Sequence, residues 1–290
     1  MIDEKHELLK LLDLKTLGLD RFAGTSPTTG WKRVFGGQVV AQALVAALRT
    51  VDADRPVHSL HGYFLRPGDP SQQILYEVER FRDGKSFTTR GVLARQHGEI
   101  IFSMSASFHA VETGMEHQLP MPRVKPPEEL PADEELLRGK GQNITLTMQN
   151  YLARDRPIEL RPADPEAYAN PKPGREARRD IWFKSKFPLP DEPAVHQAVF
   201  AYASDLTIIE TALGPHGRSL FDPKLMMASL DHAIWYHRPF RADRWLLYAQ
   251  DSPTAANGRG YNRGLVFTRD GVLVASVTQE ALMRLRRTSS

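Results

Sequence analysis

Asp205, Ser229 and Gln279 bring a carboxylate, a hydroxyl and a primary amide to the second half of the chain. A carboxylate can orient and deprotonate a water molecule. A hydroxyl and an amide can hold the same water by hydrogen bonds. Attack by a water held in this way suits an activated acyl group such as a thioester. The sequence contains no Gly-x-Ser-x-Gly turn, so a serine-hydrolase triad is not supported.

An internal repeat singles out these three residues. The two halves of the chain are related, and at three matched positions an apolar residue of the first half is polar in the second. This asymmetry predicts that the first half is scaffold, that the second half holds the site, and that each chain has one active site. The matched blocks are residues 34–39 and 199–204, 57–67 and 229–239, and 90–108 and 263–281. The matched positions are Val40 and Asp205, Val57 and Ser229, and Ala106 and Gln279.

Each polar residue also has an ordinary structural interpretation. Asp205 falls on the apolar stripe of a predicted helix, where a carboxylate is costly unless it is paired, but it could also cap the helix or reach solvent. Ser229 could simply begin a strand. Gln279 falls in the apolar row of a predicted strand, but it could face water at the strand end. A shared site is favoured because all three changes occur in the same half.

The elements that would position these residues recur in the same order in both halves. Each half has one helix that is apolar on nearly all sides, which indicates burial, followed by several strands. In residues 101–108, apolar residues alternate with serines, as in a strand with one buried face. Asp83-Gly84 and His97-Gly98 are typical of turns. The expected helices are 3–17, 39–48 and 198–213, and the expected strands are 101–108, 181–186, 229–237, 245–250, 265–269 and 272–283.

These elements predict an α+β fold. A curled antiparallel sheet wrapped around one helix buries both, and two such units can join edge to edge. Residues 111–193 hold 13 of the 21 prolines and interrupt the pattern, with some helix expected near Leu136 and Tyr151. The predicted organisation is an N-terminal repeat at 1–112, a proline-rich connection at 113–180, and a C-terminal repeat with the catalytic residues at 181–290.

Composition narrows the classes of protein and ligand. The net charge is +3, from 38 basic and 35 acidic residues that are interspersed, so nucleic acid is not expected as the main ligand. The absence of cysteine excludes disulfides and thiolate chemistry. No apolar run is long enough for a membrane span, and the N-terminus lacks a signal-peptide core. A cytoplasmic location, no cofactor and no metal are the expectations. Exposed sheet edges favour a homo-oligomer, either a dimer or a tetramer.

Several longer stretches carry a resemblance to a known family. The chain resembles the acyl-CoA thioesterase II family, whose members are double hotdog proteins. The match covers nearly the whole chain outside the proline-rich connection. It implies two tandem hotdog repeats, each with a long helix wrapped by an antiparallel sheet, joined into one continuous sheet. The stretches are VFGGQ at 34–38, HSLHGYFLRPG at 58–68, RDGKSF at 82–87, SLDHAIWYHRP at 229–239 and DGVLVASVTQE at 270–280.

The resemblance also implies a reaction. In that family a carboxylate, a hydroxyl residue and a glutamine hold the attacking water, and the matching residues here are Asp205, Ser229 and Gln279. The hydroxyl residue is Thr or Ser among relatives. The implied activity is hydrolysis of fatty acyl-CoA to free fatty acid and CoA, with no metal and no covalent intermediate. The candidate substrate-binding residues lie in the first half of the chain. Gly36, Gly37 and Gln38, at the start of the first buried helix, could bring backbone N–H groups to a ligand phosphate or carbonyl.

Two other functions remain open from the sequence. A hotdog-type enoyl-CoA hydratase pairs an Asp with a His about five residues later, whereas Glu210 stands at that distance from Asp205 and the first His is His216. A non-catalytic acyl-CoA-binding module would not need the complete polar set. Asp231 is the second choice for the site carboxylate. His232 beside it is interpreted as a structural, hydrogen-bonded residue, because neighbouring strand residues face opposite ways.

Overall fold

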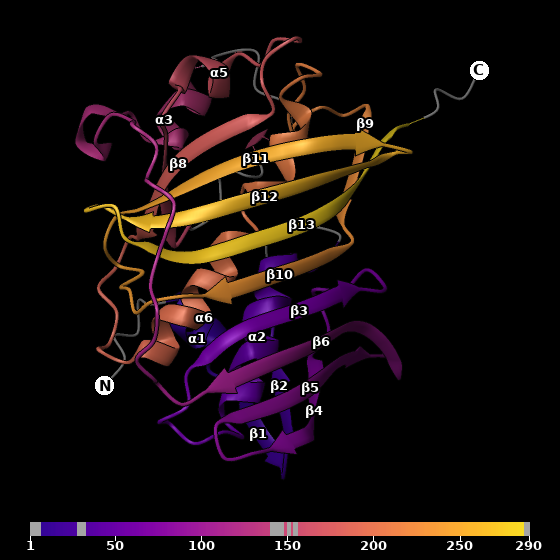
Figure 1. Cartoon of the computed structure of the whole chain (residues 1–290). Helices are drawn as coiled ribbons and strands as arrows, with labels where there is room; N and C mark the ends of the chain where they lie inside the picture. The colour runs from indigo at the N-terminus through magenta and orange to yellow at the C-terminus, as the bar shows by residue number, and fades with distance from the viewer. Residues whose placement is uncertain (1–6, 28–32, 140–147, 150–151, 153–155, 287–290) are drawn as a thin grey trace.

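The computed structural model describes residues 7–27, 33–139, 148–149, 152 and 156–286 (Figure 1). In these residues one antiparallel sheet runs in the order β1-β2-β4-β5-β6-β3-β10-β13-β12-β11-β8-β7, and β9 pairs with β13. The strands of the first half are β1 Lys15–Gly18, β2 Arg21–Gly24, β3 Val57–Phe64, β4 Ile74–Asp83, β5 Phe87–Gln96 and β6 Glu99–His109. The later strands are β7 Ile158–Pro162, β8 Arg178–Ser185, β9 Leu225–Ser229, β10 Asp231–Tyr236, β11 Leu246–Ala256, β12 Arg259–Thr268 and β13 Leu273–Leu285.

Helices cover one face of this sheet. The two that are packed behind its centre are α2 and α6, one from each half (Figure 1). None of the described helices is long and apolar enough to cross a membrane. The α-helices are α1 Glu7–Leu12, α2 Gly36–Leu48, α3 Asp133–Arg138, α5 Pro165–Ala169 and α6 Pro193–Ser204, and the 3-10 helices are η1 Pro127–Glu129 and η3 Ile208–Leu213.

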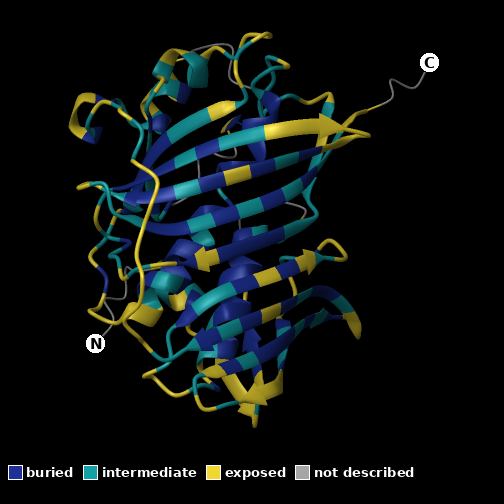
Figure 2. Cartoon of the chain, viewed as in Figure 1, coloured by how far each residue is buried: buried dark blue, intermediate teal, exposed yellow. Residues whose placement is uncertain are grey.

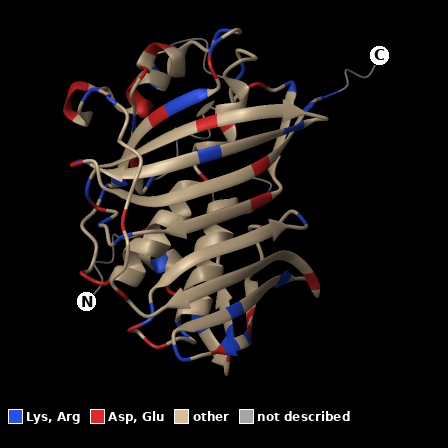
Figure 3. Ribbon diagram, viewed as in Figure 1, with Lys and Arg blue, Asp and Glu red and all other residues tan. Residues whose placement is uncertain are grey.

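The two halves join at the middle of the sheet. β3 of the first half pairs antiparallel with β10 of the second, from Ser59 opposite Trp235 to Tyr63 opposite Asp231. The inner face is buried along most of the sheet but not at the edge strand β1, and the outer face is only partly covered (Figure 2). Charges of both signs are distributed over strands and loops (Figure 3). The expected strand pairing between two edge-joined units is therefore present.

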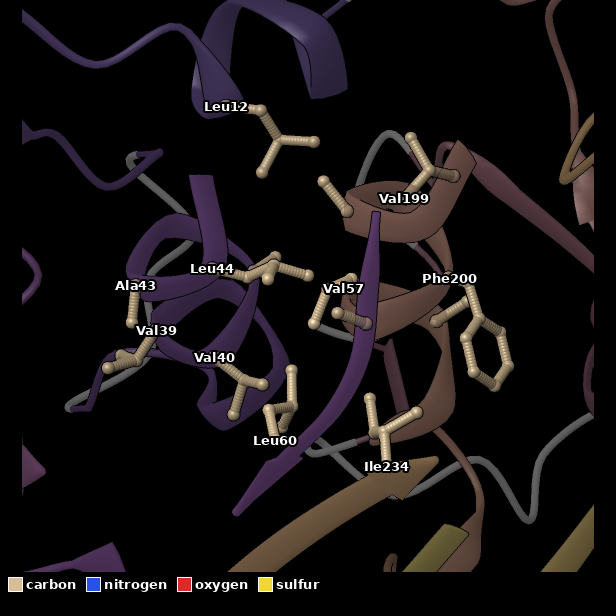
Figure 4. Close-up of a cluster of buried hydrophobic side chains, with 14 of the residues drawn as sticks. Leu12, Val39, Val40, Ala43, Leu44, Val57, Leu60, Val199, Phe200 and Ile234 are labelled. Carbon is tan, nitrogen blue, oxygen red and sulfur yellow. The ribbon is translucent and has the colours of Figure 1, made fainter. Parts of the chain in front are cut away.

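The apolar core lies between the helices and the sheet. Leu44 of α2 and Val57 of β3 lie between the two helices (Figure 4). Leu60 of β3 and Val199 of α6 belong to the same buried cluster. Nearly all residues of α2 are buried, as its apolar sequence predicted. A helix surrounded in this way is held by packing on every side. The core therefore fixes where both ends of α2 and α6 lie.

Strand register establishes which repeat positions correspond. Val57 pairs with Phe108 in the first half, and Ser229 pairs with Ala281 in the second, so Val57 and Ser229 are equivalent. Ala106 is opposite Arg90 in β5, and Gln279 is opposite Asn262 in β12. The predicted correspondence of Ala106 with Gln279 agrees with this register. The matched blocks of the sequence placed Arg90 against Arg263, whereas the strand register matches Arg90 with Asn262. A shift of one residue exchanges the two faces of a strand.

The helix expected at 198–213 is divided. α6 ends at Ser204, and η3 follows after a turn that contains Asp205. Hydrogen bonds to the sheet hold η3 in place, because the Ala212 N–H donates to Asn262 Oδ1 at 2.9 Å. Val40 lies in the second turn of α2, whereas Asp205 follows the last residue of α6. The predicted equivalence of Val40 and Asp205 is therefore wrong.

Smaller differences concern other predicted bounds. Ser229 ends β9 instead of beginning the expected strand at 229–237, because the chain bends at Leu230 before β10. The expected helix at 3–17 is described as α1, followed by β1 from Lys15, and residues 3–6 lie outside the described part. The expected proline-rich connection contains β7, which joins the sheet beside β8. It also contains the helix α3, which includes Leu136. Tyr151 lies outside the described residues.

Candidate active site

Three polar side chains from three separate elements meet behind the sheet. Gln279 Nε2 donates to Asp205 Oδ1 at 2.5 Å, and Ser229 Oγ donates to the same oxygen at 3.3 Å. Asp205 is 6% exposed and Gln279 is fully buried. The structure thus brings together the three residues that the repeat asymmetry singled out. They form a carboxylate that accepts an amide and a hydroxyl hydrogen bond on one oxygen.

Two of the three elements that carry these side chains end at this point. Asp205 caps α6, where the chain leaves the helix for η3. Ser229 is the last residue of β9, beside the bend at Leu230, whose N–H donates to the Glu280 carbonyl and whose carbonyl accepts from the Phe64 N–H. Helix ends and strand bends leave side chains free to face one another. Asp205 and Ser229 therefore lie where regular hydrogen bonding stops, whereas Gln279 lies within the paired length of β13.

The first half also contributes to this site. The backbone N–H of Gly37, in the first turn of α2, donates to the Asp205 carboxyl group. A Cβ on Gly36 would lie 2.7 Å from Asp205 Oδ2, and a Cβ on Gly37 would lie 2.5 Å from the Tyr202 carbonyl oxygen. Only glycine allows the start of α2 to approach so closely. The predicted division into a scaffold half and a catalytic half is thus too sharp, because the site lies between the halves.

Gln38 has a different role from the two glycines before it. Its buried amide donates to Ser26 Oγ at 2.8 Å and to the Thr25 carbonyl at 3.2 Å. These contacts fix the loop that follows β2. The side chain of Gln38 is therefore committed to the fold, and the start of α2 can offer a ligand only its backbone groups.

The electrostatics of Asp205 suit a base. Burial raises the pKa of Asp205 to about 6, and the hydrogen bonds from Gln279, Ser229 and Gly37 lower it in part. A general base is most effective when its pKa lies near the working pH. At neutral pH this carboxylate is ionised, yet it holds a captured proton better than an exposed Asp would.

Two further residues complete the polar cluster. His232 is fully buried, with Nδ1 at 3.0 Å from Gln279 Nε2 and Nε2 at 2.8 Å from Ser204 Oγ. Burial lowers the pKa of His232 to about 3, so the imidazole is neutral. The sequence interpretation of His232 as hydrogen-bonded was correct, but its contact with Gln279 was missed. A usable signal was present, because the matched residue of the first half is Leu60.

Asp231, the second choice of carboxylate, lies elsewhere. Its Oδ1 accepts from the Glu280 N–H at 2.6 Å, and its Oδ2 lies 3.1 Å from His61 Nε2. His61 is exposed, so this pair belongs to the outer side of the sheet. Asp231 therefore joins β10, β13 and β3 and takes no part in the cluster around Asp205.

The matched place in the first half is apolar. Val57, Leu60 and Ala106 stand where the second half has Ser229, His232 and Gln279, and all three are buried. Figure 4 shows Val57 and Leu60 among other apolar side chains. A packed apolar space has no group that could hold or deprotonate a water. The described residues thus contain one polar cluster of this type. Within the described ranges, no group of three or more His, Asp or Glu side chains is arranged to hold a metal ion.

One atom of the cluster has no protein partner. Gln279 Oε1 is buried and accepts no hydrogen bond from the described residues. Such a group is costly unless something donates to it. The cluster thus offers a base on Asp205 and a free acceptor on Gln279. This combination can bind both hydrogens of one water molecule.

Comparison with known families covers both halves. The profile of a family described as "Acyl-CoA thioesterase" matches residues 153–282. A second profile, described as "Acyl-CoA thioesterase N-terminal domain", matches residues 23–109. The profile boundaries leave the proline-rich residues 110–152 between them. Both halves of the repeat are thus matched separately.

Individual relatives match over almost the full chain. Acyl-CoA thioesterase 2 of Haemophilus influenzae is 39% identical, with 98% of this chain and 99% of that protein covered. Human acyl-coenzyme A thioesterase 8 is 41% identical, with 95% and 88% covered. The crystal structure of an acyl-CoA thioesterase II from Mycobacterium marinum is 42% identical, has a TM-score of 0.78, and covers 96% of this chain and 98% of that one.

A more distant structure shows likeness of fold. A protein with a hot dog fold from Alicyclobacillus acidocaldarius is 18% identical, with a TM-score of 0.75. It covers 96% of this chain and 98% of its own. The arrangement of sheet and helices is therefore shared well beyond the range of clear sequence similarity.

Proposed function

Because the chain belongs to the acyl-CoA thioesterase family, we propose that it hydrolyses fatty acyl-CoA by direct attack of a water held by Asp205, Ser229 and Gln279. The family makes the chain a thioester hydrolase, and the fold is the double hotdog that the sequence resemblance implied. The observation that supports the residue roles is the buried carboxylate of Asp205, with a free acceptor on Gln279 beside it.

The hydrogen bonds of Asp205 indicate which oxygen acts as the base. Oδ1 already accepts from Gln279 Nε2 and from Ser229 Oγ. Oδ2 lies on the side of Gly36, where the edge of the Phe64 ring is also close. We therefore assign proton transfer to Oδ2. The water donates one hydrogen to Oδ2 and the other to Gln279 Oε1, and Ser229 holds it indirectly, through its hydrogen bond to Oδ1 of Asp205. A lone pair of the water oxygen then faces the substrate.

The reaction then needs two proton transfers. The water oxygen attacks the thioester carbonyl carbon while Asp205 takes one of its protons. Collapse of the tetrahedral intermediate breaks the C–S bond, and Asp205 returns the proton to the departing CoA sulfur. The products are a fatty acid and CoA, and the carboxylate is regenerated.

The start of α2 can polarise the substrate carbonyl oxygen. The N–H groups in its first turn have no carbonyl partner inside the helix, so they are available to donate to that oxygen.

The pH dependence of this reaction follows from the base. Palmitoyl-CoA hydrolysis should require ionised Asp205, so kcat/KM should fall about tenfold per pH unit below a pKa of about 6. The rate is measured as free CoA with a thiol-trapping dye. Crotonyl-CoA followed in the same way distinguishes the hydratase alternative, which would add water without releasing CoA. An acid limb near the ordinary pKa of Asp, 3.8, would contradict the assignment.

The oligomeric state and the location of the protein in the cell remain predictions. Assembly as a homo-oligomer is expected from the exposed sheet edges, and a cytoplasmic location from the sequence. The outer face of the sheet carries exposed Tyr63 and Trp235 near the junction of the halves. Light scattering of the full chain measures the subunit number directly.

A further inference from the structure

We propose that His232 and Ser204 are positioning residues that keep the Gln279 amide in one orientation, with Nε2 toward Asp205 and Oε1 toward the attacking water. This inference rests on the proposed function, because the water that the amide orients is the one assigned there to the attack. The imidazole itself takes no part in the reaction. A primary amide has an oxygen and a nitrogen of nearly equal shape. Its orientation therefore depends on its hydrogen-bond partners.

Asp205 alone does not fix this orientation through the whole reaction. As a carboxylate it accepts from Gln279 Nε2, which favours the observed arrangement. Once Oδ2 has taken a proton, Asp205 is neutral, and Oδ1 becomes a weaker acceptor that holds the amide less firmly. Rotation would remove the acceptor from the water and leave the amide hydrogens facing it. A second partner, independent of the catalytic proton, is needed to prevent this.

His232 Nδ1 is such a partner. The amide nitrogen of Gln279 cannot accept a hydrogen bond, so at 3.0 Å His232 Nδ1 must be the acceptor. Gln279 Nε2 thus has both hydrogens committed, one to Asp205 and one to His232. A rotated amide would place Oε1 against the lone pair of Nδ1. The imidazole disfavours rotation in either protonation state of Asp205.

Ser204 fixes the tautomer of His232 that this requires. Its hydroxyl donates to the Ala201 carbonyl at 3.0 Å, within α6. The Ser204 oxygen is then free to accept from His232 Nε2–H at 2.8 Å. With the hydrogen on Nε2, Nδ1 keeps its lone pair. Burial keeps the imidazole neutral, since it lowers the pKa of His232 to about 3.

The first half of the chain supplies a comparison for this arrangement. Leu60 occupies the place of His232 opposite Ala106, which occupies the place of Gln279. The imidazole is therefore absent where the amide is absent. The fold accepts an apolar residue at this place, so His232→Leu is a substitution that the architecture tolerates in one of its two copies.

The test measures steady-state rates and pH profiles for His232→Leu with palmitoyl-CoA. We expect kcat to fall about tenfold to a hundredfold, because the amide no longer holds the water in one position. The acid limb should also move to higher pH by about half a unit or more, because a rotated amide no longer donates to Oδ1 and so no longer stabilises ionised Asp205. His232→Asn, whose side-chain oxygen can accept near the Nδ1 position, should recover part of both effects.

A matched control is available on the outer face of the sheet. His237 Nε2 lies 2.8 Å from Ser276 Oγ, the same distance as between His232 and Ser204, but His237 does not contact Gln279. His237→Leu should leave kcat and the acid limb at the wild-type values. If His232→Leu also leaves both unchanged while Asp205→Asn is inactive, the positioning role is wrong and the proposed function stands. If Asp205→Asn is active, the proposed function fails first.

A second measurement does not depend on activity or on the folding of His232→Leu. Nitrogen-15 NMR of the wild-type chain distinguishes a ring nitrogen with a hydrogen from one with a lone pair. We expect Nδ1 of His232 to keep its lone pair on both sides of the acid limb, and Ser204→Ala to disturb this signal. A hydrogen on Nδ1 of His232 in the wild-type chain would overturn the proposal.

Discussion

Asp205→Asn is expected to lower kcat/KM for palmitoyl-CoA by about 10²-fold or more, as for the loss of a general base. An amide at this place still accepts hydrogen bonds from Gln279 and Ser229, but it cannot take a proton from the water. Gln279, Ser229 and His232, which surround the carboxylate, supply no second carboxylate to replace it. Free CoA release, measured per folded chain, gives the result.

Asp231→Asn is the matched control for this substitution. Asp231 lies two residues beyond Ser229 in the sequence, yet its carboxylate bonds the Glu280 N–H and His61, outside the cluster around Asp205. We expect Asp231→Asn to keep kcat/KM close to the wild-type value. Near-wild-type turnover in Asp205→Asn would refute the assignment of the base.

Asp205→Asn also tests whether the Asp205 carboxylate serves activity or stability. Burial raises the pKa of Asp205 from 3.8 to about 6, so folding favours the protonated form. The wild-type chain should lose stability from this group as pH rises from 3.8 through about 6. The loss amounts to about 3 kcal/mol at neutral pH. Asp205→Asn carries no such charge, so its free energy of unfolding at neutral pH should not fall below that of the wild type.

Gln279→Ala is expected to lower kcat by about 10²-fold or more, because it removes the acceptor for the second hydrogen of the water. It also removes the hydrogen bond from Nε2 to Asp205, which lowers the pKa of that carboxyl. The acid limb should therefore move to higher pH. Ala106 occupies the matched place in the first half, so we expect the variant to fold. Rates across the pH range test both effects together.

Gln96→Ala is a suitable control for the loss of a buried amide. Gln96 Nε2 donates to the carbonyl oxygens of Asp69 and Gln72 in the first half, and its side chain has no contact with Asp205. This variant should lose stability but keep the wild-type acid limb. If Gln279→Ala shows the same behaviour as Gln96→Ala, Gln279 is structural.

Much of the fold follows from local patterns. The alternation in residues 101–108 predicts a strand, and β6 has that pattern because its apolar residues face the core. The helix after Gly36 is predicted by its apolar sequence and confirmed as α2. The end of α6 was not predicted, because the residues after Asp205 stay apolar while hydrogen bonds to β12 divert the chain into η3.

The candidate site was only partly predictable. The repeat singled out Asp205, Ser229 and Gln279, although the match of Asp205 with Val40 was incorrect. The approach of Gly37 to Asp205 depends on how α2 meets α6, which no local pattern encodes. His232 was missed as a partner of Gln279 for the same reason, since its contacts join residues far apart in the sequence.

A single turnover in ¹⁸O-labelled water, with enzyme in excess over palmitoyl-CoA, distinguishes direct water attack from covalent catalysis. Direct attack predicts one ¹⁸O atom in the released fatty acid, none in the chain, and no acylated chain after rapid quenching. If Asp205 instead attacked the thioester, an anhydride would form. An acylated chain, or ¹⁸O in Asp205 with an unlabelled fatty acid, would contradict direct attack by water.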